Sequence, residues 1–200
     1  RADNAFRVNW NKNADASGYI IEQYSNGSWN RIARIGNGST TTYRIENLKA
    51  GTNYQFRIKA FGFKGAEAVY GKYVSISGKT NPASVSGLKI GGTAKDALRL
   101  NWNTVSGAEG YIIEKYEANT WKRIARLEGG KTGTYRAEGL KAGTNYQFRV
   151  RAFGFDGNTA IYSEYKNISG KTDAAAPTVT IGNMSGVKIG GRADNALRLN

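Results

Sequence analysis

The sequence repeats itself at a fixed spacing. Residues 1–80 align without gaps with residues 93–172, and 47 of these 80 positions are identical. The best-matched block, residues 49–57, returns as residues 141–149. Self-similarity at a constant period is the signature of repeat architectures, in which each copy forms one structural unit. We therefore expect two similar domains within residues 1–172 rather than one large domain.

A third copy begins near the end of the sequence. The hexapeptide at residues 87–92 reappears in similar form at residues 186–191, at an offset of 99 instead of 92, so the second linker is seven residues longer than the first. A stretch as short as residues 187–200 cannot bury a core by itself. The expected division is a domain over residues 1–80 that lacks its first strand, a linker at 81–85, a complete domain over 86–172, a longer linker at 173–185, and the first strand and start of a third repeat at 186–200.

Each repeat has the pattern of short strands. Phe6, Val8 and Trp10 alternate with polar residues, as in a strand with one buried face. Residues 54–60 alternate in the same way, and residues 42–45 form another β-rich run. Glycine and asparagine turns separate these runs at a spacing of roughly ten residues. The pattern predicts an all-β fold with about seven strands per repeat.

Three groups of residues resemble a known family. They are Trp10, the run at residues 19–21, and the segment Leu48 to Tyr54, which is similar to the "tyrosine corner" of fibronectin type III domains. Ala50 and Ala142 stand where that pattern usually has proline, although Gly51 and its equivalent are kept. The resemblance implies tandem immunoglobulin-like β-sandwiches. It says little about function, because one fold hosts many functions.

Four aromatic residues are predicted to be structural. In such a sandwich the corner tyrosines, Tyr54 and Tyr146, cover the edge of the core while each hydroxyl binds a backbone group upstream. Trp10 and Trp102 are expected in the core, where truncation to alanine costs about 3–5 kcal/mol.

Composition and pattern argue against catalysis. The chain has no cysteine and no histidine, which removes thiolate metal sites, the usual general base and the commonest metal ligand. Glu22, Glu46, Glu114 and Glu138 could in principle pair as a glycosidase dyad, but each lies among basic residues or near a turn. For Glu22 we expect a cross-strand ion pair with Arg57. We expect no enzyme activity, no cofactor and no bound metal.

Positive charge is a property of every repeat. The formal net charge of the whole chain is +14. One interpretation of this positive charge is attraction to an anionic surface, such as an acidic glycan or a cell-wall polymer, with the tryptophans stacking on sugar rings. The second is a solvated, self-repelling face on which each tryptophan packs under an arginine stem. The candidate contact residues are Trp29, Arg31, Arg57, Lys59, Trp121, Arg123, Arg149 and Arg151.

Other partners find less support in the sequence. No helix is available to enter a nucleic-acid groove, and no RNA-binding motif is present, so specific nucleic-acid binding is not expected. No window approaches the roughly 20 apolar residues of a membrane span, and no secretory leader is visible in these residues.

The resemblance to fibronectin type III domains implies an extracellular or cell-surface repeat array of bacterial type. Its function would be that of a spacer, stalk or surface filament with adhesive potential, and the alternative is a binding module for anionic glycans through its basic face. The expected partners are neighbouring repeats of the same chain or head-to-tail copies. Residues 186–191 could complete the first domain of another copy by donating a strand. The favoured interpretation is a window on a longer array, since open-ended repeats are usual in such arrays.

Overall fold

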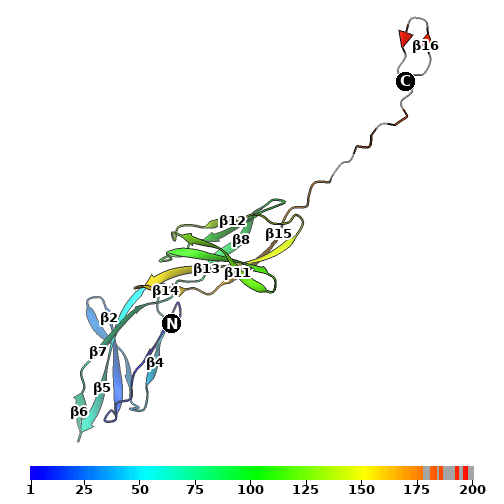
Figure 1. Cartoon of the computed structure of the whole chain (residues 1–200). Helices are drawn as coiled ribbons and strands as arrows, with labels where there is room; N and C mark the ends of the chain where they lie inside the picture. Colours follow the sequence, from blue (N-terminus) through cyan, green and yellow to red (C-terminus); the bar gives the residue numbers. More distant parts are fainter. Residues whose placement is uncertain (178–180, 184, 187–191, 194–195, 198–200) are drawn as a thin grey trace.

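The computed structural model describes residues 1–177, 181–183, 185–186, 192–193 and 196–197. Two β-sandwiches follow one another along the chain, with the N-terminus beside their junction (Figure 1). No helix occurs in the described ranges. The predicted all-β class with tandem sandwiches is confirmed.

The first repeat contains seven strands. Their bounds are β1 Phe6–Asn9, β2 Gly18–Ser25, β3 Ser28–Ile35, β4 Thr42–Ile45, β5 Asn53–Lys64, β6 Glu67–Tyr70 and β7 Val74–Lys79. β1 and β4 pair as one small antiparallel sheet, and the second sheet has the order β3-β2-β5-β6. The long strand β5 pairs with β7 along its first half and with β6 along its second half.

The second repeat has one strand more. Its strands are β8 Ser86–Thr93, β9 Leu98–Asn103, β10 Gly110–Glu117, β11 Thr120–Glu128, β12 Thr134–Ala137, β13 Asn145–Asp156, β14 Thr159–Tyr162 and β15 Lys166–Lys171. The order β12-β9-β8 forms one sheet, and β11-β10-β13-β14, with β15 on β13, forms the other. Farther along, β16 Arg192–Ala193 pairs with β17 Ala196–Leu197.

The core of each sandwich lies between its two sheets. In the second repeat, Leu98, Leu100 and Trp102 of β9 face Phe148 and Val150 of β13, and all five are buried. The equivalent cluster of the first repeat is smaller, and Trp10 lies only at its partly buried margin. The alternation that the sequence shows in these strands is therefore the division between core and surface.

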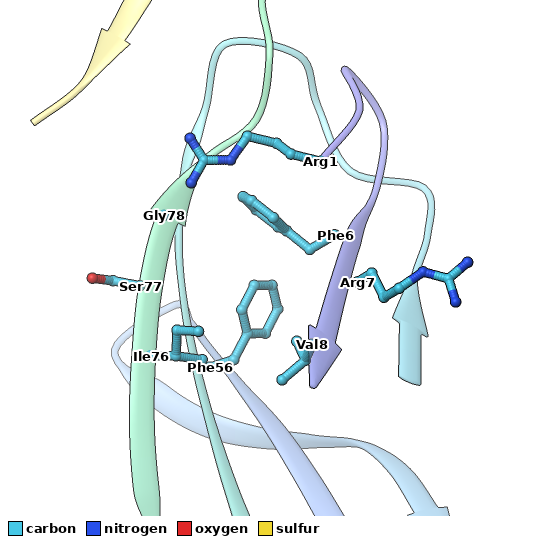
Figure 2. Close-up of a pocket in the computed structure, with 8 residues that line it drawn as sticks. All are labelled: Arg1, Phe6, Arg7, Val8, Phe56, Ile76, Ser77 and Gly78. Atoms are coloured by element: carbon cyan, nitrogen blue, oxygen red, sulfur yellow. The ribbon is translucent and has the colours of Figure 1, made fainter. Parts of the chain in front are cut away.

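A hollow beside β1 accounts for the difference between the two cores. In the second repeat, Ile90 of β8 lies against Gly170 of β15, close enough that a Cβ on this glycine would be 2.8 Å from its Cδ1 atom. The first 80 residues contain no strand equivalent to β8. There Phe6, Phe56 and Ile76 surround an open hollow next to Gly78 (Figure 2), and Ile76 is 49% exposed.

The tyrosine corners are present in both repeats. The Tyr54 hydroxyl accepts a hydrogen bond from the Lys49 backbone N–H at 2.8 Å, and the Tyr146 hydroxyl accepts one from Lys141 at 2.7 Å. Gly51 turns the chain with a φ of 60°, a backbone conformation that residues with a side chain rarely adopt. This explains why alanine can replace the usual proline before it while the glycine is kept.

One sequence expectation lies almost wholly outside the described residues. It is the spare strand at residues 186–191 that could complete the first domain of another copy, of which only Gly186 is described.

Candidate functional site

The outer face of the larger sheet carries the basic residues that the sequence singles out. On β2, Glu22 lies opposite Arg57 of β5 on one side and opposite Arg31 of β3 on the other. A bulge between Ile21 and Glu22 shifts the pairing with β3 at this point. Directly opposed residues in a sheet point to the same face, so a carboxylate stands between two arginines.

Glu22 is the centre of a hydrogen-bonded network. Its Oε2 atom accepts from Nε of Arg57 at 2.7 Å, and the terminal nitrogen of the same guanidinium lies 2.5 Å away. Its Oε1 atom accepts from the Tyr73 hydroxyl at 2.6 Å. The Glu22 side chain is only 14% exposed. The predicted cross-strand ion pair is confirmed, and Tyr73 is an additional donor.

Aromatic rings enclose the cations of this face. The Arg57 guanidinium lies 4.5 Å from the centroid of the Trp29 ring and 3.9 Å from that of Tyr73. The Lys59 ammonium lies 4.4 Å from the centroids of both Tyr70 and Tyr73. Such contacts contribute about 0.5–1 kcal/mol each where they are exposed. The arginine and lysine therefore form a ladder with the aromatic rings.

The second repeat builds the same ladder. Arg149 lies between Trp121 and Tyr165, at 4.6 and 4.0 Å from the ring centroids, and Nε donates to Glu114 at 2.7 Å. The Tyr165 hydroxyl donates to the same carboxylate at 2.6 Å. Because these contacts recur at the offset of 92 residues, the ladder is part of the repeat itself.

The lysine of the first ladder is an arginine in the second. Arg151 replaces Lys59 and lies between Tyr162 and Tyr165, at 4.0 and 4.5 Å from their ring centroids. Its Nε atom is buried and has no hydrogen-bond partner among the described residues. The planar guanidinium stacks here as a flat cation, which a lysine ammonium cannot do.

The hydrogen bonds and charges of the two ladders shift the pKa of one side chain in each repeat. Burial raises the pKa of the Glu22 carboxyl, but the hydrogen bonds from Tyr73 and Arg57 and the positive charges of Arg57 and Lys59 outweigh it, so that the net pKa lies below the ordinary 4.5. Burial and the hydrogen bond to Glu114 raise the pKa of Tyr165 to about 12. Both shifts keep the carboxylate charged and the phenol protonated near neutral pH.

The eight predicted contact residues fall into two groups. Trp29, Arg57 and Lys59 meet in the first ladder, and their equivalents meet in the second. Arg31 and Arg123 lie beside the ladders but remain exposed. The Tyr24 and Trp29 rings are tilted by 59°, so this pair offers no flat platform for a sugar ring.

Sequence reasoning missed the tyrosines that complete the ladders. Tyr70 and Tyr73, like their equivalents Tyr162 and Tyr165, follow β5 and β13 in the chain and fold back over them. Their signal was present, since both tyrosines recur unchanged at the offset of 92 among varied neighbours. Thr80 was missed too: its hydroxyl donates to the Lys49 carbonyl at 2.6 Å and ties β7 to the tyrosine corner.

The chemistry of this face is that of ion pairing and stacking. Among the described residues there is no cluster of three or more potential metal ligands, and no membrane-spanning helix is found in that part of the chain. The face can bind by its exposed arginines and can stiffen the sheet by its enclosed ones.

The family model for the fibronectin type III domain matches residues 1–74 and again residues 83–165. The chain belongs to this family. Each match covers one of the two sandwiches, so the fibronectin type III domains are arranged in tandem. Domains of this family are in general non-catalytic, are typically extracellular in receptors and secreted proteins, and also occur within enzymes.

Curated relatives carry similar fibronectin type III segments within much longer proteins. The chain is 31% identical to the receptor-type tyrosine-protein phosphatase eta of Mus musculus, over 63% of this chain and 11% of the phosphatase. It is 24% identical to exoglucanase B of Cellulomonas fimi, over 84% of this chain and 16% of that enzyme. It is 25% identical to chitinase A1 of Niallia circulans, over 88% of this chain and 25% of the chitinase. The chain thus spans a quarter or less of these relatives.

A solved structure has the same tandem arrangement. It is a segment of two fibronectin type III domains from chicken tenascin, with a TM-score of 0.51 and 20% sequence identity, over 86% of this chain and 94% of the tenascin segment. At this identity the likeness concerns the fold alone.

Proposed function

We propose that this chain is a non-catalytic spacer segment of an extracellular repeat array of bacterial type, and that it holds neighbouring modules at a fixed distance and orientation. The array would serve as a stalk or surface filament, with the repeats before and after it as partners. The receptor and the two polysaccharide-degrading enzymes among its relatives agree with a linking role between larger modules.

The junction between the two domains is the observation that carries this proposal. Arg1 forms an ion pair with Asp156 at 2.7 Å, and Lys79 approaches Glu109 at 3.5 Å, so two charge pairs cross from the first domain to the second. Pro82 of the linker is buried. A rigid linker residue combined with direct contacts on both sides limits how far the domains can rotate.

The test measures the rigidity of this junction. Spin labels on cysteines replacing the exposed Ser75 and Asn167, which occupy equivalent positions in the two domains, report one distance across the junction. We expect a single narrow distance distribution at physiological salt. Pro82→Gly combined with Asp156→Asn should broaden it, because both the stiff linker and one cross-domain charge pair are removed.

A matched control is Asp96→Asn, an exposed aspartate of the second domain that forms no ion pair across the junction. This change should leave the distribution unaltered. A distribution that is already broad in the unmodified chain would contradict the spacer role.

The exposed arginines support a second candidate, a binding module for anionic glycans or cell-wall polymers. Arg31 and Arg123 remain exposed next to the ladders, whereas Arg57 and Arg149 are neutralised by glutamates. The first pair is therefore free to meet a polyanion without first breaking an internal contact.

Substituting the exposed arginines and the enclosed arginines in separate variants distinguishes an effect on glycan binding from an effect on stability. Arg31→Gln with Arg123→Gln should weaken retention on a carboxylated polysaccharide by about tenfold at low salt, with little change in melting temperature. Arg57→Gln with Arg149→Gln should lower the melting temperature instead. Affinity chromatography and thermal melts measure the two effects. Equal retention of both double variants and the unmodified chain would argue against a glycan-binding face.

A further inference from the structure

The junction inside the chain shows how one domain receives another. The end of the second domain that faces the first, here termed its head, takes up Pro82 of the linker, whose Cγ atom lies 3.6 Å from the position of a Cβ on Gly154. Ile161, on β14 beside it, is only 5% exposed. The head of the second domain is thus a covered apolar seat with two carboxylates, Asp156 and Glu109, that bind the cations of the preceding domain.

The equivalent seat on the first domain is open. Asp15, Gly62, Val69 and Tyr70 are among the residues that line a hollow there, here termed the head socket. Val69 occupies the position of Ile161 but is 45% exposed, and Tyr70 is 57% exposed. Exposed apolar side chains around a hollow are typical of a contact surface whose partner is absent.

One of the two charges of the head socket is reversed relative to the covered seat, and the other is a carboxylate in both. Lys64 stands at the position of Asp156, and Asp15 stands at the position of Gly107 in a neighbouring loop. Both Lys64 and Asp15 are exposed. A domain end that presents Arg1 would therefore meet Lys64 at the position where the covered seat has Asp156, with Glu67 of β6 opposite that lysine.

The far end of the second domain is here termed its tail. It differs from the tail of the first domain by having a carboxylate in place of the positive charge of Arg1. Thr93 stands where the first domain has Arg1, and its hydroxyl donates to Asp173 at 2.6 Å, which places a carboxylate beside the position of that arginine. Lys171 stands at the position of Lys79 and is exposed. The tail therefore presents one carboxylate, Asp173, and one ammonium, Lys171, at its surface.

We propose that the head socket of the first domain binds the tail of a second domain, with Asp173 paired to Lys64, Lys171 paired to Asp15, and Ala174 seated where Pro82 sits in the internal junction. The proposal rests on the array function proposed above and names its contact partner. For the present chain the occupant is the second domain of another copy.

The charges of Lys64 and Asp173 disfavour the wrong order of domains. A first-domain tail docked on a first-domain head would bring Arg1 toward Lys64, and a second-domain tail docked on a second-domain head would bring Asp173 toward Asp156. Like charges that lie opposite each other destabilise an interface. Such repulsion often gives protein contacts their specificity. The two types of domain end therefore alternate along the array.

Cross-linking between two variants of the full chain tests this contact. The chain contains no cysteine, so Val69→Cys in one preparation and Ala174→Cys in another introduce single thiols while leaving all four charges in place. When the two are mixed under mild oxidation, we expect the mixed disulfide dimer in about tenfold excess over the Val69→Cys homodimer. A Lys122→Cys variant, whose thiol takes the place of an exposed side chain on β11, replaces Val69→Cys as the control and should give no such excess.

Charge reversal decides whether the proposed pairs carry the contact. Lys64→Glu added to the Val69→Cys chain should remove the excess, and Asp173→Lys added to the Ala174→Cys chain should restore it. An absent excess, or one that ignores Lys64→Glu, overturns the proposal; the second result would indicate strand exchange at the hollow beside β1 instead. The spin-label distance reports the internal junction separately, so a failed spacer role and a failed head socket give different results.

Discussion

Replacing Trp102 by alanine is expected to lower the free energy of unfolding of the second domain by about 3–5 kcal/mol. Trp102 lies in the main core cluster and is only 5% exposed. β8 pairs with β9, the strand that carries Trp102, and closes that side of the sandwich. The surrounding strands are held on both sides and cannot collapse into the cavity, so the cost should fall in the upper part of the range for large core residues.

Calorimetry of the full chain measures this effect as a shift of one unfolding transition. Trp10→Ala is the matched comparison and should cost less than the 3–5 kcal/mol expected from the sequence, because Trp10 is only partly buried. Trp102→Phe should also cost less than alanine, since it fills part of the cavity and removes a buried indole N–H that has no partner in the described structure. Equal losses for Trp10→Ala and Trp102→Ala would contradict the packing described here.

Replacing Glu22 by glutamine is expected to lower the free energy of unfolding of the first domain by about 2 kcal/mol at neutral pH. The change removes the charge that accepts hydrogen bonds from Arg57 and Tyr73 and leaves the guanidinium partly buried without its partner. Losing a hydrogen bond to a charged group costs about 1.5–3 kcal/mol. The partial exposure of the Arg57 side chain, 26%, places the expected loss in the lower part of that range.

The pH dependence of this loss identifies the carboxylate as its cause. The folded-state pKa of Glu22 lies below the ordinary 4.5, so its contribution to stability is present above that pH and is lost as the pH falls through the lowered pKa. The difference between wild type and Glu22→Gln should therefore be constant from pH 6 to 8 and shrink below about pH 4.5. Denaturant unfolding across this range measures it, with Glu46→Gln, a surface ion pair, as the control. A difference that persists unchanged into acid would contradict the assignment.

Much of the fold was already specified locally. The offset of 92 residues defined two equivalent units, the alternation at Phe6 and Val8 marked a half-buried strand, and Gly51 marked a turn that needs a positive φ. These features depend on backbone conformation and on which side chains avoid water, and both leave a periodic trace in the sequence.

The candidate site was predicted in part. Trp29, Arg57 and Lys59 are predicted as contacts for a polyanion or glycan, and the Glu22–Arg57 pair follows from expected strand neighbours. The pattern does not show that Tyr73, in the connection before β7, encloses both cations, because that contact depends on how β7 returns along β5.

The sequence by itself determined the repeat, the all-β class and the family, since these follow from periodicity and from local motifs. Only the tertiary structure decided which charges are free and which are already paired. It separated the exposed Arg31 from the enclosed Arg57, and it brought Arg1 to Asp156 across 155 positions of the chain. The physical reason is that pairing and burial depend on distances through space, which the folded backbone sets and which spacing along the chain does not record.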